Sequence, residues 1–280
     1  MIQDIGEHIY HNEYTPKPPK PESVLLCYEG REIFANVTED KISYPTFKEA
    51  ESCNDKKELY EDYTYLFSID DICYYLGSNL NYREIPGYQM EDTQVYRRVM
   101  PKYLAFAGVT GWQLHRWYST RKYCGRCGKP MVHDEKERMM RCPECGLMEF
   151  PKICPAVIIG VTHGDKILMS KYAGREFKKY ALIAGFAEIG ETIEETVKRE
   201  VMEEVGLKVK NITYYKSQPW SFTDTLLMGF FCELDGAEDI TLDEDELAMA
   251  EWFTREEMPV KWEGVSLTNE MMMVFKEGKI

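Results

Sequence analysis

Three glutamates, Glu200, Glu203 and Glu204, stand at positions i, i+3 and i+4 of a segment whose pattern predicts a helix. Thr192 is a favourable N-cap, and Glu195, three residues later, completes a capping box. On the helix that follows, residues at i, i+3 and i+4 place their side chains on one face. Because like charges so close together repel one another in the absence of a cation, this segment constrains the chain more than any other.

The other edge of the same helix carries apolar residues at four-residue steps, Ile193, Val197, Val201 and Val205. Such a stripe packs a helix onto a sheet, and Gly206 is the residue type that ends a helix. Oxygen ligands that converge on one spot suit Mg²⁺ or Mn²⁺, ions that are shared with substrate phosphates. The alternative is a solvated acidic helix face, which is common where only two or three glutamates are counted.

Segments with the pattern of strands lie on both sides of this helix, and the first two predict a hairpin across the turn His163-Gly164-Asp165. The predicted strands are Ala156–Val161, Ile167–Tyr172, Tyr180–Phe186, Val209–Ser217, Leu226–Leu234 and Met249–Phe253. A C-terminal helix is predicted near Asn269–Lys276. Upstream, apolar residues between Tyr96 and Tyr118 indicate a further helix, although Pro101 and Gly108 interrupt its pattern.

Four of the nine cysteines form two Cys-x2-Cys pairs, Cys124 with Cys127 and Cys142 with Cys145. Two such pairs at this separation predict a zinc ribbon. Four thiolates complete a tetrahedral zinc site and leave no position for water, so the predicted metal is structural. A rubredoxin-like iron site and unpaired buried cysteines are the alternatives. The odd cysteine number and the lack of an export signal argue against a disulfide framework.

The net charge of −14 disfavours a non-specific grip on nucleic acid, which needs a basic surface. The hairpin Lys129–Arg141 within the ribbon mixes both signs of charge, which favours a scaffold role for it. No segment approaches the roughly 18 apolar residues of a membrane span, and no signal peptide is visible. We therefore expect a cytoplasmic protein without a membrane partner.

The segment Gly185–Leu207 has the fixed positions of the Nudix box, and residues 150–280 resemble a Nudix hydrolase. The resemblance implies an α/β fold, a Nudix α/β/α sandwich with a mixed sheet. By position it implies that the three helix glutamates bind catalytic Mg²⁺ or Mn²⁺, with Glu203 or Glu204 also a candidate to activate water. Arg199 and Glu191 would orient this cluster. The predicted catalytic residues are Glu191, Arg199, Glu200, Glu203 and Glu204.

Ten residues after the end of the box, Ser217–Thr225 resembles the array that marks the NADH pyrophosphatase family, whose other hallmark is a zinc ribbon upstream. The Ser-Gln-Pro-Trp run and the later Phe match, whereas Ser221, Thr223 and Thr225 depart from the family residues. The resemblance implies hydrolysis of NAD(H) to NMN(H) and AMP. The residues that it assigns to substrate binding are Phe150, Phe186, Ser217, Gln218, Trp220 and Phe222.

In the resemblance, Phe150 and Phe186 sandwich a base, contributed by opposite subunits of a homodimer. Ordinary core packing is the alternative for each ring. Glu246 matches a further acidic metal-site position, and its alternative is membership of the solvated acidic run Asp239–Glu246. The segment Ser266–Thr268 stands where the family brings backbone close to the substrate phosphate.

The sequence therefore predicts three parts: an N-terminal α+β domain at 1–119, a zinc ribbon at 120–149 and a Nudix domain at 150–280. The same chemistry would also remove NAD from the 5′ end of RNA, the one form in which RNA is expected as a partner. A Nudix hydrolase of another nucleoside diphosphate derivative, such as ADP-ribose, is an alternative. A non-catalytic nucleotide-binding regulator is less favoured, because such modules usually lose the box carboxylates.

Overall fold

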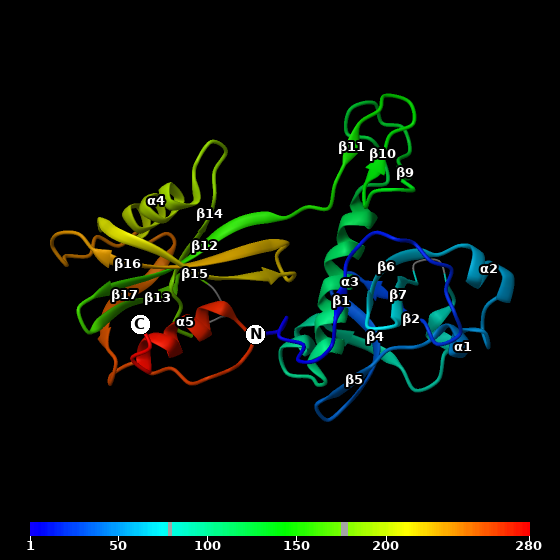
Figure 1. Ribbon diagram of the computed structural model, residues 1–280, viewed down its shortest axis with the longest axis horizontal. Coiled ribbons are helices and arrows are strands. Elements are labelled where there is room, and N and C mark those ends of the chain that lie inside the picture. The colour runs from blue at the N-terminus through cyan, green and yellow to red at the C-terminus, as the bar shows by residue number, and fades with distance from the viewer. Residues whose placement is uncertain (78–79, 175–178) are drawn as a thin grey trace. The chain divides into compact units, whose positions relative to one another are not determined.

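A computed structural model of the protein describes residues 1–77, 80–174 and 179–280 (Figure 1). The chain forms two compact units. The C-terminal unit comprises Ile153–Trp220 and Asp224–Ile280 together with Met1, and the N-terminal unit comprises Ile2–Lys152 and Ser221–Thr223. Within the described ranges, no helix is both long enough and apolar enough to cross a membrane.

The C-terminal unit is built on one mixed sheet of six strands, in the order β15-β16-β12-β13-β17, with β14 also paired to β12. The central pair, β12 and β16, is parallel, and the other pairs are antiparallel. The strands are β12 (Cys154–His163), β13 (Lys166–Tyr172), β14 (Ile183–Phe186), β15 (Val209–Trp220), β16 (Thr225–Leu234) and β17 (Leu247–Thr254). The helices are α4 (Ile193–Val205) and α5 (Leu267–Lys276).

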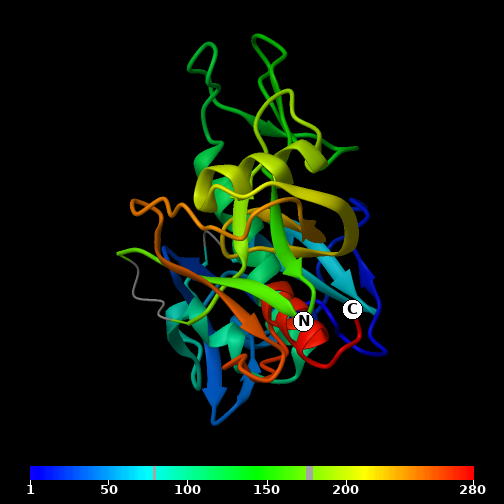
Figure 2. The ribbon, with the colours of Figure 1, turned by 90° about the vertical axis from the view of Figure 1, so that its left-hand side faces the viewer.

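Helices α4 and α5 cover opposite faces of this sheet, as Figures 1 and 2 show. Residues Val157, Ile159 and Val161 of β12 pack in one core with the valines of α4. The intervening Ile158 packs in the other core with Leu267 and other residues of α5. Alternate strand residues face opposite sides of a sheet, so the apolar run of β12 fills both cores. The predicted α/β/α sandwich with a mixed sheet is confirmed.

Helix α4 begins and ends where local signals predict. The hydroxyl of Thr192 accepts from the N–H of Glu195, and the Glu195 carboxylate accepts from the Thr192 N–H, so the capping box is formed. Gly206 adopts a left-handed conformation with φ of 68°, and its N–H donates to the Met202 carbonyl. The predicted stripe is buried, with Val197, Val201 and Val205 inaccessible to solvent.

The hairpin across residues 163–165 is confirmed, because Thr162 pairs with Ile167 and His163 with Lys166. One predicted strand is shorter than expected: Tyr180–Phe186 contains a strand only at Ile183–Phe186. The reason is a change of partner, since Ala181 bridges to Ser170 of β13, whereas β14 pairs with β12. The remaining predicted strands and the C-terminal helix are present, with ends shifted by a few residues.

The N-terminal unit contains two four-stranded sheets, and its predicted mixture of strands and helices is confirmed. One sheet has the order β1-β6-β7-β2, and the other has the order β3-β4-β5 with β8 paired to β4. The strands are β1 (Tyr10–His11), β2 (Val24–Leu26), β3 (Tyr28–Glu29), β4 (Glu32–Thr38), β5 (Lys41–Ser43), β6 (Thr64–Ile69), β7 (Ile72–Leu76) and β8 (Gln89–Asp92). The helices are α1 (Phe47–Ala50), α2 (Lys56–Glu61), η1 (Tyr82–Glu84), η2 (Thr93–Arg97) and α3 (Lys102–Thr120).

Helix α3 starts directly after Pro101, which is its N-cap, so the proline begins the predicted helix instead of breaking it. Gly108 lies within the helix because tyrosine rings pack on its backbone: a Cβ there would stand 2.2 Å from the Tyr44 hydroxyl. The Tyr28 hydroxyl donates to the Gly108 carbonyl over 2.6 Å. Gly108, which interrupts the apolar pattern, is therefore required because the helix and the tyrosine side chains approach each other closely at this position.

The ribbon follows α3 as a three-stranded sheet in the order β11-β10-β9. Its strands are β9 (Val132–His133), β10 (Met140–Arg141) and β11 (Met148–Glu149). All three belong to the N-terminal unit. The predicted domain boundaries at residues 119/120 and 149/150 stay predictions.

Candidate active site

Helix α4 presents the three predicted glutamates in two different environments. Glu200 is 8% exposed and Glu204 is 2% exposed, whereas Glu203 is exposed to solvent. The difference follows from the helix period, because positions 200 and 204 are one turn apart and lie closer to the buried valine stripe. Two carboxylates are thus carried into the edge of the core, and the third stays in contact with water.

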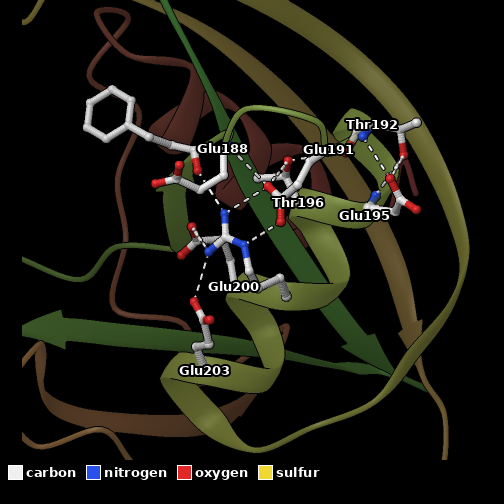
Figure 3. A network of polar contacts seen from close by, with 9 residues as sticks. Glu188, Glu191, Thr192, Glu195, Thr196, Glu200 and Glu203 are labelled. Atoms are coloured by element: carbon white, nitrogen blue, oxygen red, sulfur yellow. Dashed lines mark hydrogen bonds and ion pairs between the residues drawn. The ribbon is translucent and has the colours of Figure 1, made fainter.

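Arg199 joins Glu191, Glu200 and Glu203 through hydrogen bonds. Figure 3 shows these three glutamates within one network of polar contacts. One terminal nitrogen of its guanidinium group donates to Glu200 over 2.7 Å and to Glu203 over 2.8 Å. The other terminal nitrogen donates to the Phe186 carbonyl over 2.9 Å and to Glu191 over 3.0 Å. Charge-assisted bonds of this kind are among the strongest in proteins. Arg199 therefore fixes the relative positions of β14, α4 and the turn between them.

Glu191 also stabilises the turn between β14 and α4. Its carboxylate accepts from the Glu188 N–H over 3.0 Å and from the Thr196 hydroxyl over 2.9 Å. The hydrogen bond from Arg199, followed by these bonds, lowers the pKa of Glu191 to about 2. Thr196 was not among the predicted site residues, and the sequence signal for it is weak, since a buried threonine one turn into a helix has no distinctive spacing.

Glu204 is the most unusual side chain of the site, because both of its carboxylate oxygens are buried and neither has a hydrogen bond of good geometry among the described residues. The backbone of Ala184 lies near enough to lower the pKa of Glu204, but this effect is smaller than that of burial. Burial, and then the charges of Glu200 and Glu246, raise the pKa of Glu204 to about 8. Burial also raises the pKa of Glu200. A buried and unpaired carboxylate is costly unless a cation or a donor compensates it.

Glu246 lies in an exposed turn just before β17, outside the α4 helix. Its charge raises the pKa of both Glu200 and Glu204. The charge of Asp243 acts on Glu204 in the same direction. Asp243 was not singled out in the sequence, where it is one of several acids in the run 239–246. The fold brings this part of the run beside the helix glutamates.

The donor set fits a hard divalent cation, which would replace the missing partners of Glu204 with oxygen coordination. The carboxylates do not yet converge as ligands around one point. In the parts of the chain that the structure describes, the four ribbon cysteines are the one group of three or more His, Cys, Asp or Glu residues with the geometry of a metal site. The carboxylates of Glu200 and Glu203 do not converge with that of Glu204, because both pair with the guanidinium group of Arg199.

The Ser-Gln-Pro-Trp run forms the end of the edge strand β15, where Gln218 pairs with Leu227 and Trp220 with Thr225 of β16. Ser217 and Trp220 are half-buried, but Gln218 is fully buried. Its amide nitrogen donates to the Val265 carbonyl over 2.9 Å, and its oxygen accepts from the Leu267 N–H over 2.7 Å. Gln218 thus ties β15 to the start of α5.

Phe222 is buried and belongs to the N-terminal unit with its neighbours Ser221 and Thr223, whereas Ser217–Trp220 belongs to the C-terminal unit. Its ring lies edge-on to Trp112 at 6.3 Å and under the guanidinium of Arg97 at 4.4 Å. Arg116 donates to the carbonyls of Ser221 and Phe222. These contacts describe a packed side chain, and the assignment of Phe222 to substrate binding stays a prediction.

Phe150 and Phe186 are both exposed, by 56% and 54% respectively. Core packing, the alternative for each ring, is therefore wrong. Phe186 follows directly after Gly185 at the end of β14, and its carbonyl accepts from Arg199. Phe150 follows β11 in the N-terminal unit. Each ring is accessible to a flat ligand.

The four ribbon cysteines bring their sulfur atoms together within 4.8 Å of one another. Cys124 and Cys145 are 3.5 Å apart, as are Cys127 and Cys142. Tetrahedral zinc with bonds of about 2.3 Å separates its sulfur ligands by about 3.8 Å, so the cluster fits this metal. The prediction that these cysteines form one site is confirmed, and unpaired buried cysteines are excluded as their explanation.

Comparison with known protein families locates two domains in the chain. The NUDIX domain model matches residues 152–273. The model described as NADH pyrophosphatase zinc ribbon domain matches residues 119–150.

Curated relatives include proteins named NAD-capped RNA hydrolase NudC from Citrobacter koseri, Salmonella heidelberg and Escherichia coli. Each is 40% identical over 150 residues, which is 54% of this chain and 58% of the relative. A solved NUDIX hydrolase from Nitrosomonas europaea is 22% identical with a TM-score of 0.47, covering 56% of this chain and 91% of its own. The chain thus spans somewhat over half the length of its curated relatives, and it contains a NUDIX domain preceded by a zinc ribbon domain of the NADH pyrophosphatase type.

Proposed function

We propose that this protein hydrolyses the pyrophosphate bond of NAD(H), giving NMN(H) and AMP. The observation that carries the proposal is Glu204, a buried carboxylate with both oxygens unpaired, beside Glu200 and within the field of Glu246. Such a cluster is stable when a cation occupies it. Mg²⁺ or Mn²⁺ is the proposed cation, with Glu200, Glu203, Glu204 and Glu246 as its ligands.

A divalent cation bound there supplies charge neutralisation on the pyrophosphate and lowers the pKa of an attacking water. Around it, each residue of this chain has a separate task. Arg199 and Glu191 position the glutamates through the contacts of Figure 3. Glu203 or Glu204 accepts the proton of the water that attacks phosphorus, and the bridging oxygen of the pyrophosphate leaves with the other nucleotide. No covalent enzyme intermediate is needed.

The choice of NAD(H) as substrate rests on four features. The zinc ribbon is of the NADH pyrophosphatase type, and the Ser217–Trp220 run follows the box at the expected offset. The relatives are named NAD-capped RNA hydrolases, which supports NAD at the 5′ end of RNA as a further substrate. Exposed Phe150 and Phe186 support stacking on a flat base. We propose that the two rings come from opposite subunits of a homodimer.

The decisive experiment is product analysis by mass spectrometry in ¹⁸O-labelled water with NADH, ADP-ribose and NAD-capped RNA. We expect NMNH and AMP from NADH, with one labelled oxygen on the product whose phosphorus is attacked. The Glu203→Gln and Glu204→Gln variants should lose metal-dependent turnover while remaining folded. A tenfold or greater preference for ADP-ribose in kcat/KM would assign the alternative substrate class, another nucleoside diphosphate derivative.

A non-catalytic nucleotide-binding regulator is the second alternative. All three helix glutamates are present, and two of them, Glu200 and Glu203, pair with Arg199, which argues against a degenerate site. Binding of NADH without any release of AMP in the presence of Mg²⁺ or Mn²⁺ would favour this alternative.

A further inference from the structure

The charge of this chain is distributed very unevenly around the zinc ribbon. None of its 48 Asp and Glu residues lies between Asp92 and Asp134, although the net charge of the whole chain is −14. The same stretch contains eight of the 34 Lys and Arg residues: Arg97, Arg98, Lys102, Arg116, Arg121, Lys122, Arg126 and Lys129. A local excess of cations of this size can bind an anion that the rest of the surface repels.

Several of these cations are already engaged within the N-terminal unit. Arg97 lies over the Phe222 ring, and Arg98 donates to the Glu39 carbonyl. Arg116 donates to the carbonyls of the 221–222 segment, and Arg121 pairs with Glu149 over 3.6 Å. These four side chains therefore already make contacts within the protein.

Three cations remain on the first zinc knuckle. Lys122, Arg126 and Lys129 are exposed, and their side chains make no hydrogen bond or ion pair within the described part of the chain. The knuckle holds them together, because the Cys124 N–H donates to the Lys129 carbonyl and the Met131 N–H donates to the Lys122 carbonyl. The tight turn around the metal thus concentrates three positive charges on a short hairpin.

Tyr123 lies among these cations. It is 69% exposed, bridges to Pro130 across the hairpin, and its ring contacts no other aromatic ring among the described residues. A large exposed aromatic side chain beside cations is the arrangement by which proteins hold single-stranded nucleic acid, with bases on the ring and phosphates on the cations. We call Lys122, Tyr123, Arg126 and Lys129 the first-knuckle surface.

The balanced charges of the 129–141 hairpin suggest a scaffold role when only the sequence is considered. In the structure, two of its cations are occupied: Arg138 donates to the Asn12 carbonyl and lies over the Tyr14 ring, and Arg141 lies 3.6 Å from Asp134. Lys129 is exposed and belongs to the first knuckle, where its carbonyl accepts from the Cys124 N–H. Folding therefore separates a neutralised part of the ribbon from a basic one.

We propose that the first-knuckle surface binds single-stranded RNA, as the chain that follows the NAD cap of a capped substrate. This inference rests on the proposed function and assigns part of its substrate recognition to the ribbon. The three cations contact phosphates and Tyr123 stacks on a base, so binding is tolerant of sequence and sensitive to salt. Free NADH has no such chain and does not need the surface.

The first test compares two substrates with one variant. In the triple variant Lys122→Ala, Arg126→Ala, Lys129→Ala, kcat/KM for NAD-capped RNA should fall about tenfold at low salt, with kcat/KM for NADH unchanged. The control variant Lys48→Ala, Lys57→Ala, Lys136→Ala removes the same charge from exposed positions elsewhere in the unit. Bound zinc, measured in each variant, shows that the ribbon is intact. Equal losses in the two triple variants would overturn the proposal.

The second test measures RNA binding directly, so it remains decisive if neither NADH nor capped RNA is hydrolysed and the proposed function fails. A fluorescein-labelled, unstructured RNA of about ten nucleotides serves as the probe in anisotropy titrations of the full chain. Loss of three phosphate contacts should reduce the slope of log K against log salt by about 2, at about 0.7 per contact.

Variants of Tyr123 distinguish binding of RNA from binding of a generic polyanion or an acidic protein. Tyr123→Ala should weaken RNA binding about fivefold or more, whereas Tyr123→Phe should retain it, because the phenyl ring still stacks on a base. Binding of polyglutamate with the same affinity as RNA, unaffected by Tyr123→Ala, would identify a general anion site and overturn the assignment to RNA.

Discussion

The carboxylate of Glu200 lies directly against Gly185 on the neighbouring strand β14, at the place where any other side chain would begin. A Cβ at position 185 would stand 1.9 Å from the Cδ of Glu200. Gly185 is therefore required by the close approach of α4 to the sheet, and it fixes how deeply the carboxylate is buried.

Gly185→Ala should destabilise the protein by about 1–3 kcal/mol, since overpacking forces Glu200 or the helix to shift. The hydrolytic rate should fall with it, because Glu200 is a proposed metal ligand. Urea unfolding followed by circular dichroism measures the first effect. Gly125→Ala is the control, since a Cβ there meets no atom within 4 Å. Equal unfolding free energies for the two variants would contradict the close approach.

At neutral pH, Glu204→Gln should stabilise the metal-free protein by about 1–3 kcal/mol, because a carboxyl whose pKa is raised to about 8 must take up a proton on folding, whereas glutamine needs none. The same change should abolish the stabilisation that Mn²⁺ gives to the wild type, which would be about 2.7 kcal/mol at a concentration one hundred times the Kd. Thermal unfolding with and without Mn²⁺ measures both effects. Glu244→Gln, an exposed acid outside the helix, is the control. If Mn²⁺ raises the Tm of the Glu204 variant as much as that of the wild type, Glu204 is not a ligand.

Phe186 and Phe222 should respond differently to truncation. Phe186→Ala should leave the Tm nearly unchanged, since the ring is 54% exposed, and should raise KM for NADH by the loss of about 1–3 kcal/mol of stacking. Phe222→Ala should cost about 3 kcal/mol of stability, because its ring packs between Trp112 and Arg97. Paired measurements of Tm and KM test the contrast. A rise in KM without loss of stability in the Phe222 variant would restore it as a substrate contact.

Cys142→Ser should remove the metal of the ribbon, and the wild type should contain about one zinc ion per chain. Elemental analysis of protein purified without added metal measures this content and also detects iron, the alternative metal. Because structural zinc contributes folding energy, proteolysis within residues 134–138 should accelerate in the variant. Cys154→Ser lies outside the four-cysteine cluster and should keep the metal. Retention of zinc by Cys142→Ser would remove that cysteine from the ligand set.

Thr192→Ala should cost about 1 kcal/mol, since it removes one half of the capping box of α4. Glu194→Ala changes the same helical turn without a capping contact and should cost less. Urea unfolding measures both effects, and unfolding of Thr192→Ala, Glu195→Ala and the variant with both changes gives the coupling between the partners of the box. Additive effects of Thr192→Ala and Glu195→Ala would show that the reciprocal bonds contribute nothing.

The sequence determined the features that depend on neighbours along the chain. The limits of α4 follow from Thr192, Glu195 and Gly206 because capping is a contact over three or four residues. The hairpin around Gly164 and the two Cys-x2-Cys pairs that form the cysteine cluster also follow from short spacings along the chain. The carboxylate face of α4 follows from the helical period alone.

Tertiary structure decided what each of these side chains meets. Glu203 and Glu204 are adjacent in sequence and equivalent in the box pattern, yet one is exposed and the other is buried without a partner. Gln218 and Phe222 stand in one short array, but the first holds the start of α5 and the second is packed against Trp112. Burial and partners depend on segments far away in the sequence, and local spacing carries no information about them.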